Sequence, residues 1–294
     1  MLLEPIFHYA TNQTSVLYSS LYSPHQLGVY PIARSTTSEQ EQMPLENSGN
    51  MFLMLKGLDN AGVDGSWYAA AMDMLRTWAG EMCTALPFPA AQLSTDDFMG
   101  AYANNTNLAA KGVIALEAFA DIGGGEEYRK AAREFAAVWS AESISSSGDH
   151  YKMAFGAPDR SYSLKYNLLW QKLLRMDGPF VDWDEIAAKE VAFYESKALK
   201  YGPPLESTLD GTRPIFRTMV KLDWLSWCAS MGEGKEQFRR LFDVIFDMLN
   251  ETKSRVVMTD LWDTITGISF SGMINTFVAR PVVGAVYAKM LLAE

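Results

Sequence analysis

The chain has 294 residues, of which 48% are hydrophobic, so it can bury a large core and is expected to form one domain over residues 1–294. Acidic side chains outnumber basic ones by 35 to 25, which gives a formal net charge of −10. No cluster of Lys and Arg could follow a phosphate backbone, which argues against a nucleic acid partner. The apolar tail at residues 281–293 is shorter than the roughly 20 residues of a membrane span, which argues against a membrane partner.

The first residues lack the features of a signal peptide. There is no basic region, and Glu4 and Pro5 interrupt any apolar stretch, so a cytoplasmic location is expected. Cys83 and Cys228 lie in helical patterns and are expected to be free thiols. With three histidines and no HExxH, CxxC or phosphate-loop motif, the sequence predicts no metal and no cofactor.

Apolar residues recur at three- and four-residue steps along the chain, which is the spacing of amphipathic helices. The first such segment, residues 45–60, follows Pro44, and the second, residues 67–86, ends before Pro87. Further pairs lie at 104–121 and 126–142, at 163–176 and 183–198, and at 221–231 and 234–250, with a last segment at 280–293. We expect each pair to fold as a helical hairpin.

The hairpins recur at a regular interval. Their first helices start at about residues 45, 104, 163, 221 and 280. A two-helix unit cannot bury its apolar face alone, so neighbouring units must cover one another. The sequence therefore predicts an all-α fold, an (α/α)6 toroid of helical hairpins around a central cavity, with a non-closing helical stack as the alternative. Residues 44–294 would form the hairpins, complete or with one incomplete, and residues 1–43 an N-terminal helix and a loop over the cavity.

Long connectors before the first helix of each pair carry carboxylates and amides beside aromatic residues. In a toroid, these segments emerge at one end, and we expect the following residues to open inner helices there: Pro44, Asn104, Ser163, Asp223 and Arg280. Taken singly, Asp96, Asn104 and Ser163 are expected to be helix caps. If the segments instead converge on the cavity, their carboxylates share a partly desolvated space in which acid and base roles can separate.

Nine short runs resemble, in the same order, the C-terminal helical domain of fungal and bacterial glutaminase A-like proteins. The runs are MPLENSGN, STDDF, NNTNLAAKG, SLKYNLLWQKLL, KYGPPLES, KLDW, NETKSRV, TDLWDTITG and FVARPVVG. They cover most of the chain from about residue 40 onward. The resemblance implies a six-hairpin-glycosidase-like (α/α)6 toroid and hydrolysis of the side-chain amide of glutamine, and the fold adds glycoside hydrolysis as a further reaction. Such proteins usually also carry an N-terminal β-rich domain and a secretion signal.

The sequence departs from the family pattern at several polar positions. Asn47 and Gln171 stand where the family usually has acids, Glu206 stands in place of an Asp, and residues 213–216 are an insertion. An amide keeps the size of a carboxylate but cannot accept a proton usefully. These changes predict that the chain is a poor glutaminase.

The remaining carboxylates in these runs are the candidates for a general acid and base. The catalytic candidates are Glu46, Asp97, Asp223, Asp260 and Asp263. The candidates for binding a small-molecule substrate are His25, Asn50, Lys165, Tyr166, Asn167, Trp170, Lys221, Trp224, Trp262 and Arg280. Among them, His25 lies in a segment that resembles the family's cavity-covering loop, and a basic side chain at 165, 221 or 280 would hold a substrate carboxylate.

Three functions remain open, and no pattern indicates an oligomeric state. The chain could hydrolyse an amide or glycosidic bond by carboxylate acid/base chemistry. Alternatively, it could be an intracellular biosynthetic enzyme that has lost hydrolysis and cyclises or isomerises an apolar natural-product intermediate against its tryptophans. A non-catalytic binding module is the third alternative, but the retained carboxylates argue against it, because burying unneeded charges is costly.

Overall fold

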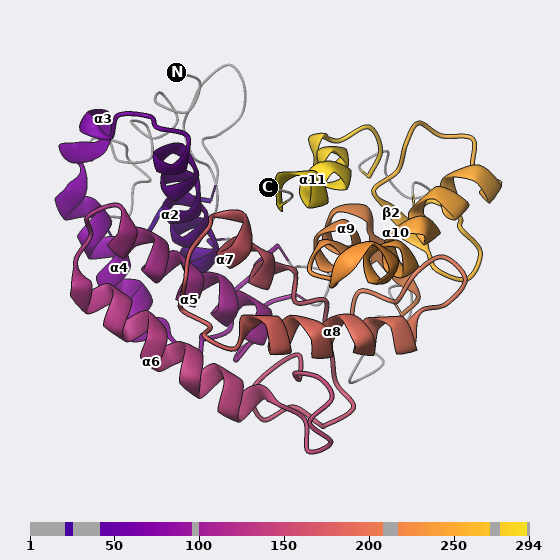
Figure 1. Ribbon diagram of the computed structural model, residues 1–294, viewed down its shortest axis with the longest axis horizontal. Helices are drawn as coiled ribbons and strands as arrows, with labels where there is room; N and C mark the ends of the chain where they lie inside the picture. Colours follow the sequence, from indigo (N-terminus) through magenta and orange to yellow (C-terminus); the bar gives the residue numbers. More distant parts are fainter. Residues whose placement is uncertain (1–20, 26–41, 96–99, 208–216, 271–276, 293–294) are drawn as a thin grey trace. The chain divides into compact units, whose positions relative to one another are not determined.

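The computed structural model describes residues 21–25, 42–95, 100–207, 217–270 and 277–292, and this part of the chain is mostly helical (Figure 1). It divides into two compact units, Met1–Ala141 with Leu174–Val181, and Glu142–Leu173 with Asp182–Glu294. The expectation of one domain stays a prediction.

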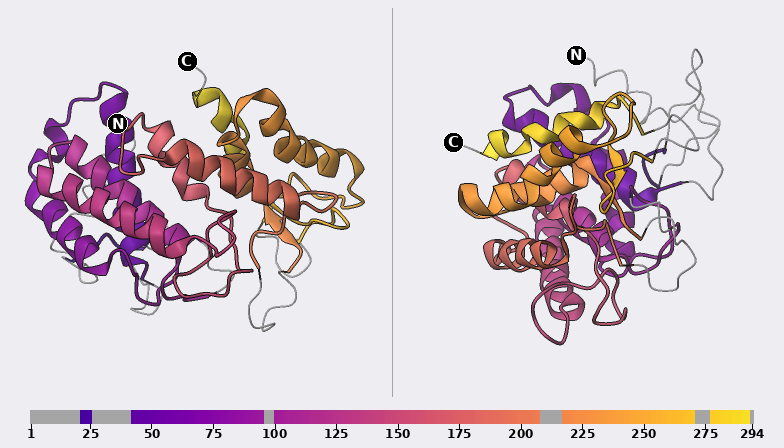
Figure 2. Two further views of the ribbon diagram at one scale, coloured as in Figure 1. Left: turned by 60° about the horizontal axis from the view of Figure 1, so that its bottom comes forward. Right: turned by 90° about the vertical axis from the view of Figure 1, so that its right-hand side faces the viewer.

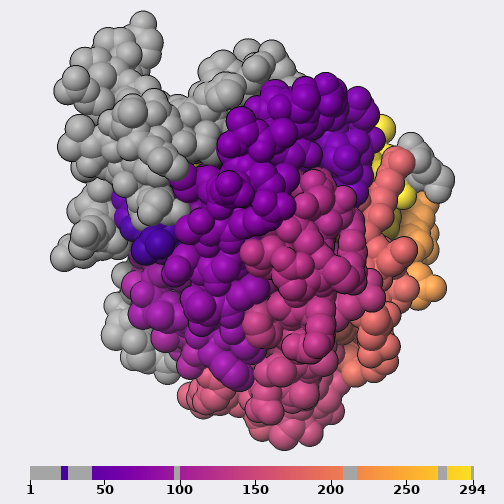
Figure 3. Space-filling model, turned by 90° about the vertical axis from the view of Figure 1, so that its left-hand side faces the viewer, coloured from indigo at the N-terminus to yellow at the C-terminus, as the bar shows by residue number. Residues whose placement is uncertain are grey.

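The first unit consists of paired helices. They are α2 (Pro44–Asn60), α3 (Ser66–Ala69), α4 (Met72–Ala85), α5 (Thr106–Asp121) and α6 (Glu126–Ser143), the last two residues of which belong to the second unit. Figure 3 shows one face of the molecule, on which these helices form much of the surface in indigo to magenta. The short connection between α5 and α6 needs glycine, because Gly123 and Gly125 have φ values of 96° and 140°.

Helix α5 is the centre of the first unit. Every residue from Thr106 to Ala120 is buried, as expected of a helix surrounded by others. Small residues let its neighbours approach closely, since a Cβ on Gly112 would lie 2.9 Å from the Leu45 side chain of α2. The rings of Phe52 and Phe119 stack with their centroids 4.5 Å apart and join the same two helices.

The second unit holds shorter helices and one pair of strands. Its elements are η3 (Tyr166–Leu168), α7 (Leu169–Leu173), α8 (Trp183–Lys197), β1 (Met219–Lys221), α9 (Leu222–Ser230), α10 (Gly234–Glu251), β2 (Leu261–Asp263), η5 (Pro281–Tyr287) and α11 (Ala288–Leu292). Helices α9 and α10 pack against each other, in orange in Figure 2. Strands β1 and β2 are antiparallel, with Met219 opposite Asp263 and Lys221 opposite Leu261.

Several predicted helix ends are wrong. Asn104 does not open α5, because it has a φ of 61° and the cap is Asn105, whose side chain accepts a hydrogen bond from the N–H of Leu108 at 3.0 Å. Ser163 is not a cap either. It forms a β-bridge with Glu206, three residues before η3 begins.

Other predicted helices are interrupted or shorter than expected. The segment at 67–86 is split into α3 and α4, the one at 163–176 is reduced to η3 and α7, and the one at 280–293 is a 3₁₀ helix followed by α11. In contrast, Pro44 occupies the first turn of α2, Asp223 the first turn of α9, and Arg280 the N-cap position of η5, as expected. The expected cap Asp96 and the expected N-terminal helix lie outside the described residues.

The predicted all-α fold class is confirmed. The described part of the chain contains one named pair of strands, each three residues long, and the other named elements are helices. None of the described helices combines the length and the apolar character needed to cross a membrane. Both cysteines are free, and Cys228 is buried.

Candidate functional site

A charged cluster lies where β1 passes into α9 in the second unit. The N–H of Leu222 donates to the carbonyl of Asp260 at 2.9 Å, which holds the start of α9 beside the residue that precedes β2. As a result, the Lys221 ammonium lies 3.4 Å from Oδ1 of Asp223 and 3.2 Å from Oδ2 of Asp260. All three side chains are buried, so their charges interact in surroundings of low polarity.

Arg280 completes this cluster. Its Nε lies 3.2 Å from both carboxylate oxygens of Asp260, and its Nη2 also donates to Oδ2. Such fork contacts between guanidinium and carboxylate are among the strongest polar interactions in proteins. Burial alone would raise the pKa of Asp260, but the hydrogen bonds from Arg280 and the charge of Lys221 outweigh burial and lower it. Asp260 is therefore held as a carboxylate.

Asp223 is in a different electrostatic state from Asp260. Burial raises its pKa, and the opposing charge of Lys221 does not cancel that effect. Among the described residues, none donates a hydrogen bond to its Oδ1, and the Lys221 ammonium is the charged group that lies beside this atom. Two neighbouring carboxylates thus share one lysine while their pKa values are shifted in opposite directions, an arrangement that separates acid and base roles.

An aromatic cluster adjoins the charges. The rings of Tyr166 and Trp224 stack at 4.9 Å, and Trp227 lies next to Tyr166 and to Trp170. The Lys221 ammonium lies 5.4 Å from the centre of the Trp224 ring, within the range of cation–π attraction. Tyr166 and Trp224 are fully buried, whereas Trp170 and Trp227 are partly exposed. The sequence-based candidates Tyr166, Trp170, Lys221 and Trp224 therefore do come together.

Lys165 and Asn167 make contacts that favour structural roles. The buried Lys165 ammonium donates to the carbonyls of Tyr151 and Ser163, both at 3.1 Å, and to Oγ of Ser163 at 3.2 Å. Oδ1 of Asn167 accepts a hydrogen bond from Nε1 of Trp170 at 2.9 Å. Substrate binding by either residue stays a prediction.

Trp262 and Asp263 also serve the local structure of the second unit. The buried indole of Trp262 donates to the carbonyl of Tyr201 at 2.9 Å. Oδ1 of Asp263 accepts from the N–H groups of Ile265 and Thr266, at 3.1 and 2.7 Å, and from the Thr266 hydroxyl. Burial raises the pKa of Asp263, but these bonds and one from Thr218 outweigh it and lower the pKa. These contacts favour a turn-stabilising role over a catalytic one.

A second charged cluster lies in the first unit around Glu46. Oε1 of Glu46 accepts hydrogen bonds from the Lys111 ammonium and the Thr95 hydroxyl. Lys111 also donates to Oδ1 of Asn50 at 3.0 Å. The side chains of Lys111 and Glu46 are only 4% and 3% exposed, so this is a buried ion pair between α5 and α2. No described residue donates a hydrogen bond to Oε2 of Glu46.

For the remaining sequence-based candidates, the structure does not establish a role. The N–H of His25 donates to Oε1 of Gln42 at 3.2 Å, and its role in binding stays a prediction. Asp97 lies outside the described residues. In the described ranges, no group of three His, Cys, Asp or Glu side chains could hold a metal ion. Because Glu46 and Asp223 belong to different units, their convergence on one cavity also stays a prediction.

Comparison with known proteins decides the family. A model of the glutaminase A six helical-hairpin domain matches residues 1–290. The chain belongs to this family. It is 30% identical to glutaminase A of Aspergillus oryzae over 304 residues, which cover 99% of the chain and 41% of that relative. It is also 24% identical to a probable glutaminase of Arthroderma benhamiae over 383 residues, which cover 100% of the chain and 43% of that relative.

Membership of the glutaminase A six helical-hairpin family confirms the resemblance and fold class predicted from the sequence. The chain spans about two fifths of the length of the curated relatives it matches. At the positions where the sequence analysis found amides in place of the family's usual acids, Asn47 lies beside Glu46 on α2, and Gln171 lies buried on α7. Asn47 thus directly follows the candidate Glu46, and Gln171 directly follows the candidate Trp170.

Lys111 is the residue that sequence reasoning missed in this family member. It lies in the resembling run NNTNLAAKG, in the stretch 108–116 of α5, which is otherwise apolar. A single lysine on such a helix signals a buried charge, which requires a partner of opposite charge. The partner, Glu46, lies 65 residues earlier, so the local sequence could reveal the need for a counter-ion but not its identity.

Proposed function

We propose that this glutaminase A-like chain is a hydrolase that acts on a small molecule by carboxylate acid/base chemistry, with Asp223 as the group that transfers the proton. One observation carries the proposal, namely that Asp223 and Asp260 share Lys221 while their pKa values are shifted in opposite directions. The curated relatives, both named as glutaminases, support an amide bond as the bond that is cleaved.

The roles of the residues follow from their contacts. Asp260 stays ionised and fixes Lys221 and Arg280 in place. Asp223 has a raised pKa and an oxygen, Oδ1, that accepts no hydrogen bond from the described residues. A raised pKa makes a carboxylate a better base, which can take a proton from an attacking water and give it to the leaving nitrogen. The Lys221 ammonium beside it would stabilise negative charge that develops on the substrate oxygen.

A specific observation favours a second candidate function. The partly exposed rings of Trp170 and Trp227, next to the stacked pair of Tyr166 and Trp224, offer more aromatic surface than glutamine requires. Such a surface suits an apolar intermediate that is cyclised or isomerised with one proton transfer by Asp223. In that case the reaction would release no ammonia.

Ammonia release from glutamine by the purified chain separates the two functions. Because Asn47 and Gln171 replace acids, we expect weak release, below about 1 per second, a low rate for an enzyme. Introducing Asn47→Glu together with Gln171→Asp should increase the release. A release at an enzyme-like rate in the unchanged chain would show that position 171 is not catalytic, and no release even from the double variant would favour the second function.

Two single variants test the role of Asp223. Asp223→Asn should abolish any turnover, whereas the control Asp73→Asn should leave it unchanged, because the Asp73 side chain is 99% exposed on α4. Turnover that survives in Asp223→Asn with native-like circular dichroism would refute the assignment of proton transfer to Asp223.

A further inference from the structure

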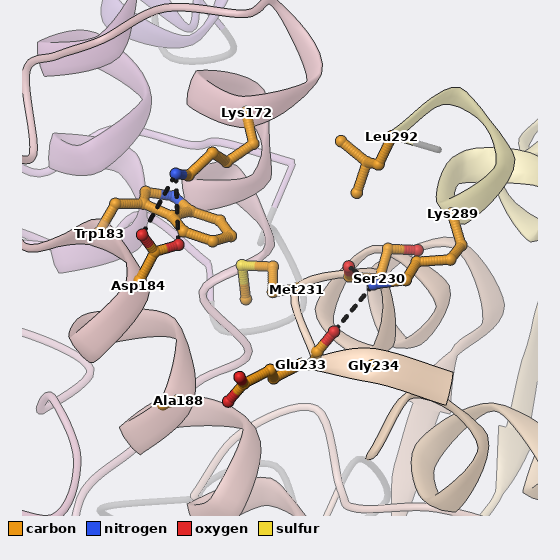
Figure 4. Close-up of a pocket in the computed structure, with 11 residues that line it drawn as sticks. Lys172, Trp183, Asp184, Ala188, Ser230, Met231, Glu233, Gly234, Lys289 and Leu292 are labelled. Carbon is orange, nitrogen blue, oxygen red and sulfur yellow. Dashed lines mark hydrogen bonds and ion pairs between the residues drawn. The ribbon is translucent and has the colours of Figure 1, made fainter. Parts of the chain in front are cut away.

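A pocket of about 630 Å³ lies within the second unit and includes none of the candidate catalytic residues. It is formed by the end of α7, the start of α8, the connection from α9 to α10, and α11 (Figure 4). A volume of this size is typical of sites that bind small molecules. Its walls combine apolar groups from Met231, Leu292, Ala188 and the Trp183 ring with four charged side chains.

The two lysines of this pocket differ in how their charges are balanced. In Figure 4, Lys172 and Asp184 lie on one side, and the Lys172 ammonium is 3.2 Å from the Asp184 carboxylate. Lys289 lies on the other side and donates to two backbone carbonyls, of Ser230 at 3.0 Å and of Gly232 at 2.8 Å. Among the described residues, no carboxylate lies within 4 Å of the Lys289 ammonium.

Lys289 has no ionic partner among the residues that the structure describes. Its side chain is partly buried, and burial lowers its pKa, with no acidic neighbour acting in the opposite direction. The other acid of the pocket, Glu233, is exposed to solvent, where water screens its charge. An anion next to this partly buried ammonium would add a charge-assisted hydrogen bond to the two that it donates to backbone carbonyls.

The formal charges of the four charged side chains cancel, and the backbone adds partial positive charge to the pocket wall. Trp183 and Asp184 begin α8, and Glu233 and Gly234 begin α10, so the first residues of two long helices lie on the pocket wall. Neither helix has a side-chain cap that hydrogen-bonds to its first N–H groups. Helix N-termini carry a partial positive charge and attract anions.

We propose that this pocket binds a small organic carboxylate, whose anionic group pairs with Lys289 and whose apolar body contacts Met231 and Leu292. One ammonium that forms no ion pair within the described residues matches one carboxylate, and the apolar groups match a short hydrocarbon chain. The proposal does not depend on the role of Asp223, because the pocket and the charged cluster share no residue.

Calorimetric titration with hexanoate tests this proposal, with 1-hexanol as the neutral analogue and inorganic phosphate as an anion without an apolar body. We expect hexanoate to bind at least about tenfold more tightly than either, since a charge-assisted hydrogen bond corresponds to roughly that factor. The hexanoate affinity of the unchanged chain should fall as the pH rises through the lowered pKa of Lys289, because the ammonium then loses its charge.

Variants locate the binding. Lys289→Met should weaken hexanoate binding by about tenfold or more, Lys289→Arg should retain most of it, and the control Lys130→Met should not change it. Lys130 is a suitable control because its side chain is 77% exposed on α6. Equal binding of hexanol and hexanoate, no binding of hexanoate at all, or unchanged affinity in Lys289→Met would overturn the proposal. If Lys289→Met does not fold, Lys289→Arg and the pH dependence of the unchanged chain decide in its place.

Discussion

Two substitutions that look equivalent in the sequence should have very different effects on stability. Glu46→Gln and Asp223→Asn each replace a buried candidate carboxylate by its amide. The larger loss of stability is expected at Glu46. Its partner Lys111 is 4% exposed and has Asn50 as its other acceptor, so Glu46→Gln leaves a buried ammonium with no negative partner among the described residues.

The expected magnitudes follow from the two sets of contacts. Removing one member of a buried ion pair costs about 3–5 kcal/mol of unfolding free energy. Asp223→Asn removes a carboxylate that burial disfavours, and Lys221 keeps Asp260 at 3.2 Å, so its cost should be about 1 kcal/mol or less. With typical urea dependence, Glu46→Gln should lower the midpoint of unfolding of the first unit by about 1–2 M.

Urea unfolding followed by tryptophan fluorescence and far-UV circular dichroism measures both effects, and coincident transitions of the two probes test whether unfolding is a single step. The matched control is Glu46→Gln combined with Lys111→Met, which removes both charges and should recover much of the loss. Equal midpoint shifts for Glu46→Gln and Asp223→Asn, or a double variant no more stable than Glu46→Gln, would refute this reasoning.

Two further predictions concern the acids of the second unit. The native pKa of Asp223 is raised above its unfolded value, so its stabilising contribution is present below the unfolded pKa and is lost as the pH rises through the native pKa. The difference in unfolding free energy between the unchanged chain and Asp223→Asn should show this loss. A difference that does not change with pH would contradict the prediction. Asp263→Ala removes the acceptor of the Ile265 and Thr266 N–H groups, so it should lower the unfolding free energy by about 1–2 kcal/mol without affecting turnover. A loss of turnover at unchanged stability would instead indicate a catalytic role for Asp263.

The sequence predicted the helices well where one face is apolar over a long stretch. Helices α2, α6, α8 and α10 begin and end within about two residues of their predicted bounds, because periodicity and local turn residues determine them. Predictions failed where a distant partner competes with the helix. Residues before η3 are extended because the N–H of Leu164 donates to the carbonyl of Leu205, a contact that no local pattern reveals.

In the candidate site, too, local sequence patterns identified residues but could not reveal their distant partners. Local runs identified Asp223, Asp260 and Arg280, which the structure brings together. They could not distinguish these residues from Asp263, because the difference lies in which donors surround each carboxylate. For Asp263, the donors are its own turn and Thr218, whereas for Asp260 they are charged side chains from two other segments.

The pairing of β1 with β2 also limits how this region can vary in length. Successive residues of a strand point to opposite faces, so a shift of one residue would move Lys221 away from both carboxylates. A single-residue insertion or deletion between Met219 and Asp223 should therefore dismantle the charged cluster even if every helix survives. The exposed turn at 265–266, which follows β2, is bonded instead to Asp263, whose side chain is not part of the charged cluster. Recombination or design within this domain should treat residues 219–223 and 260–263 as one indivisible block.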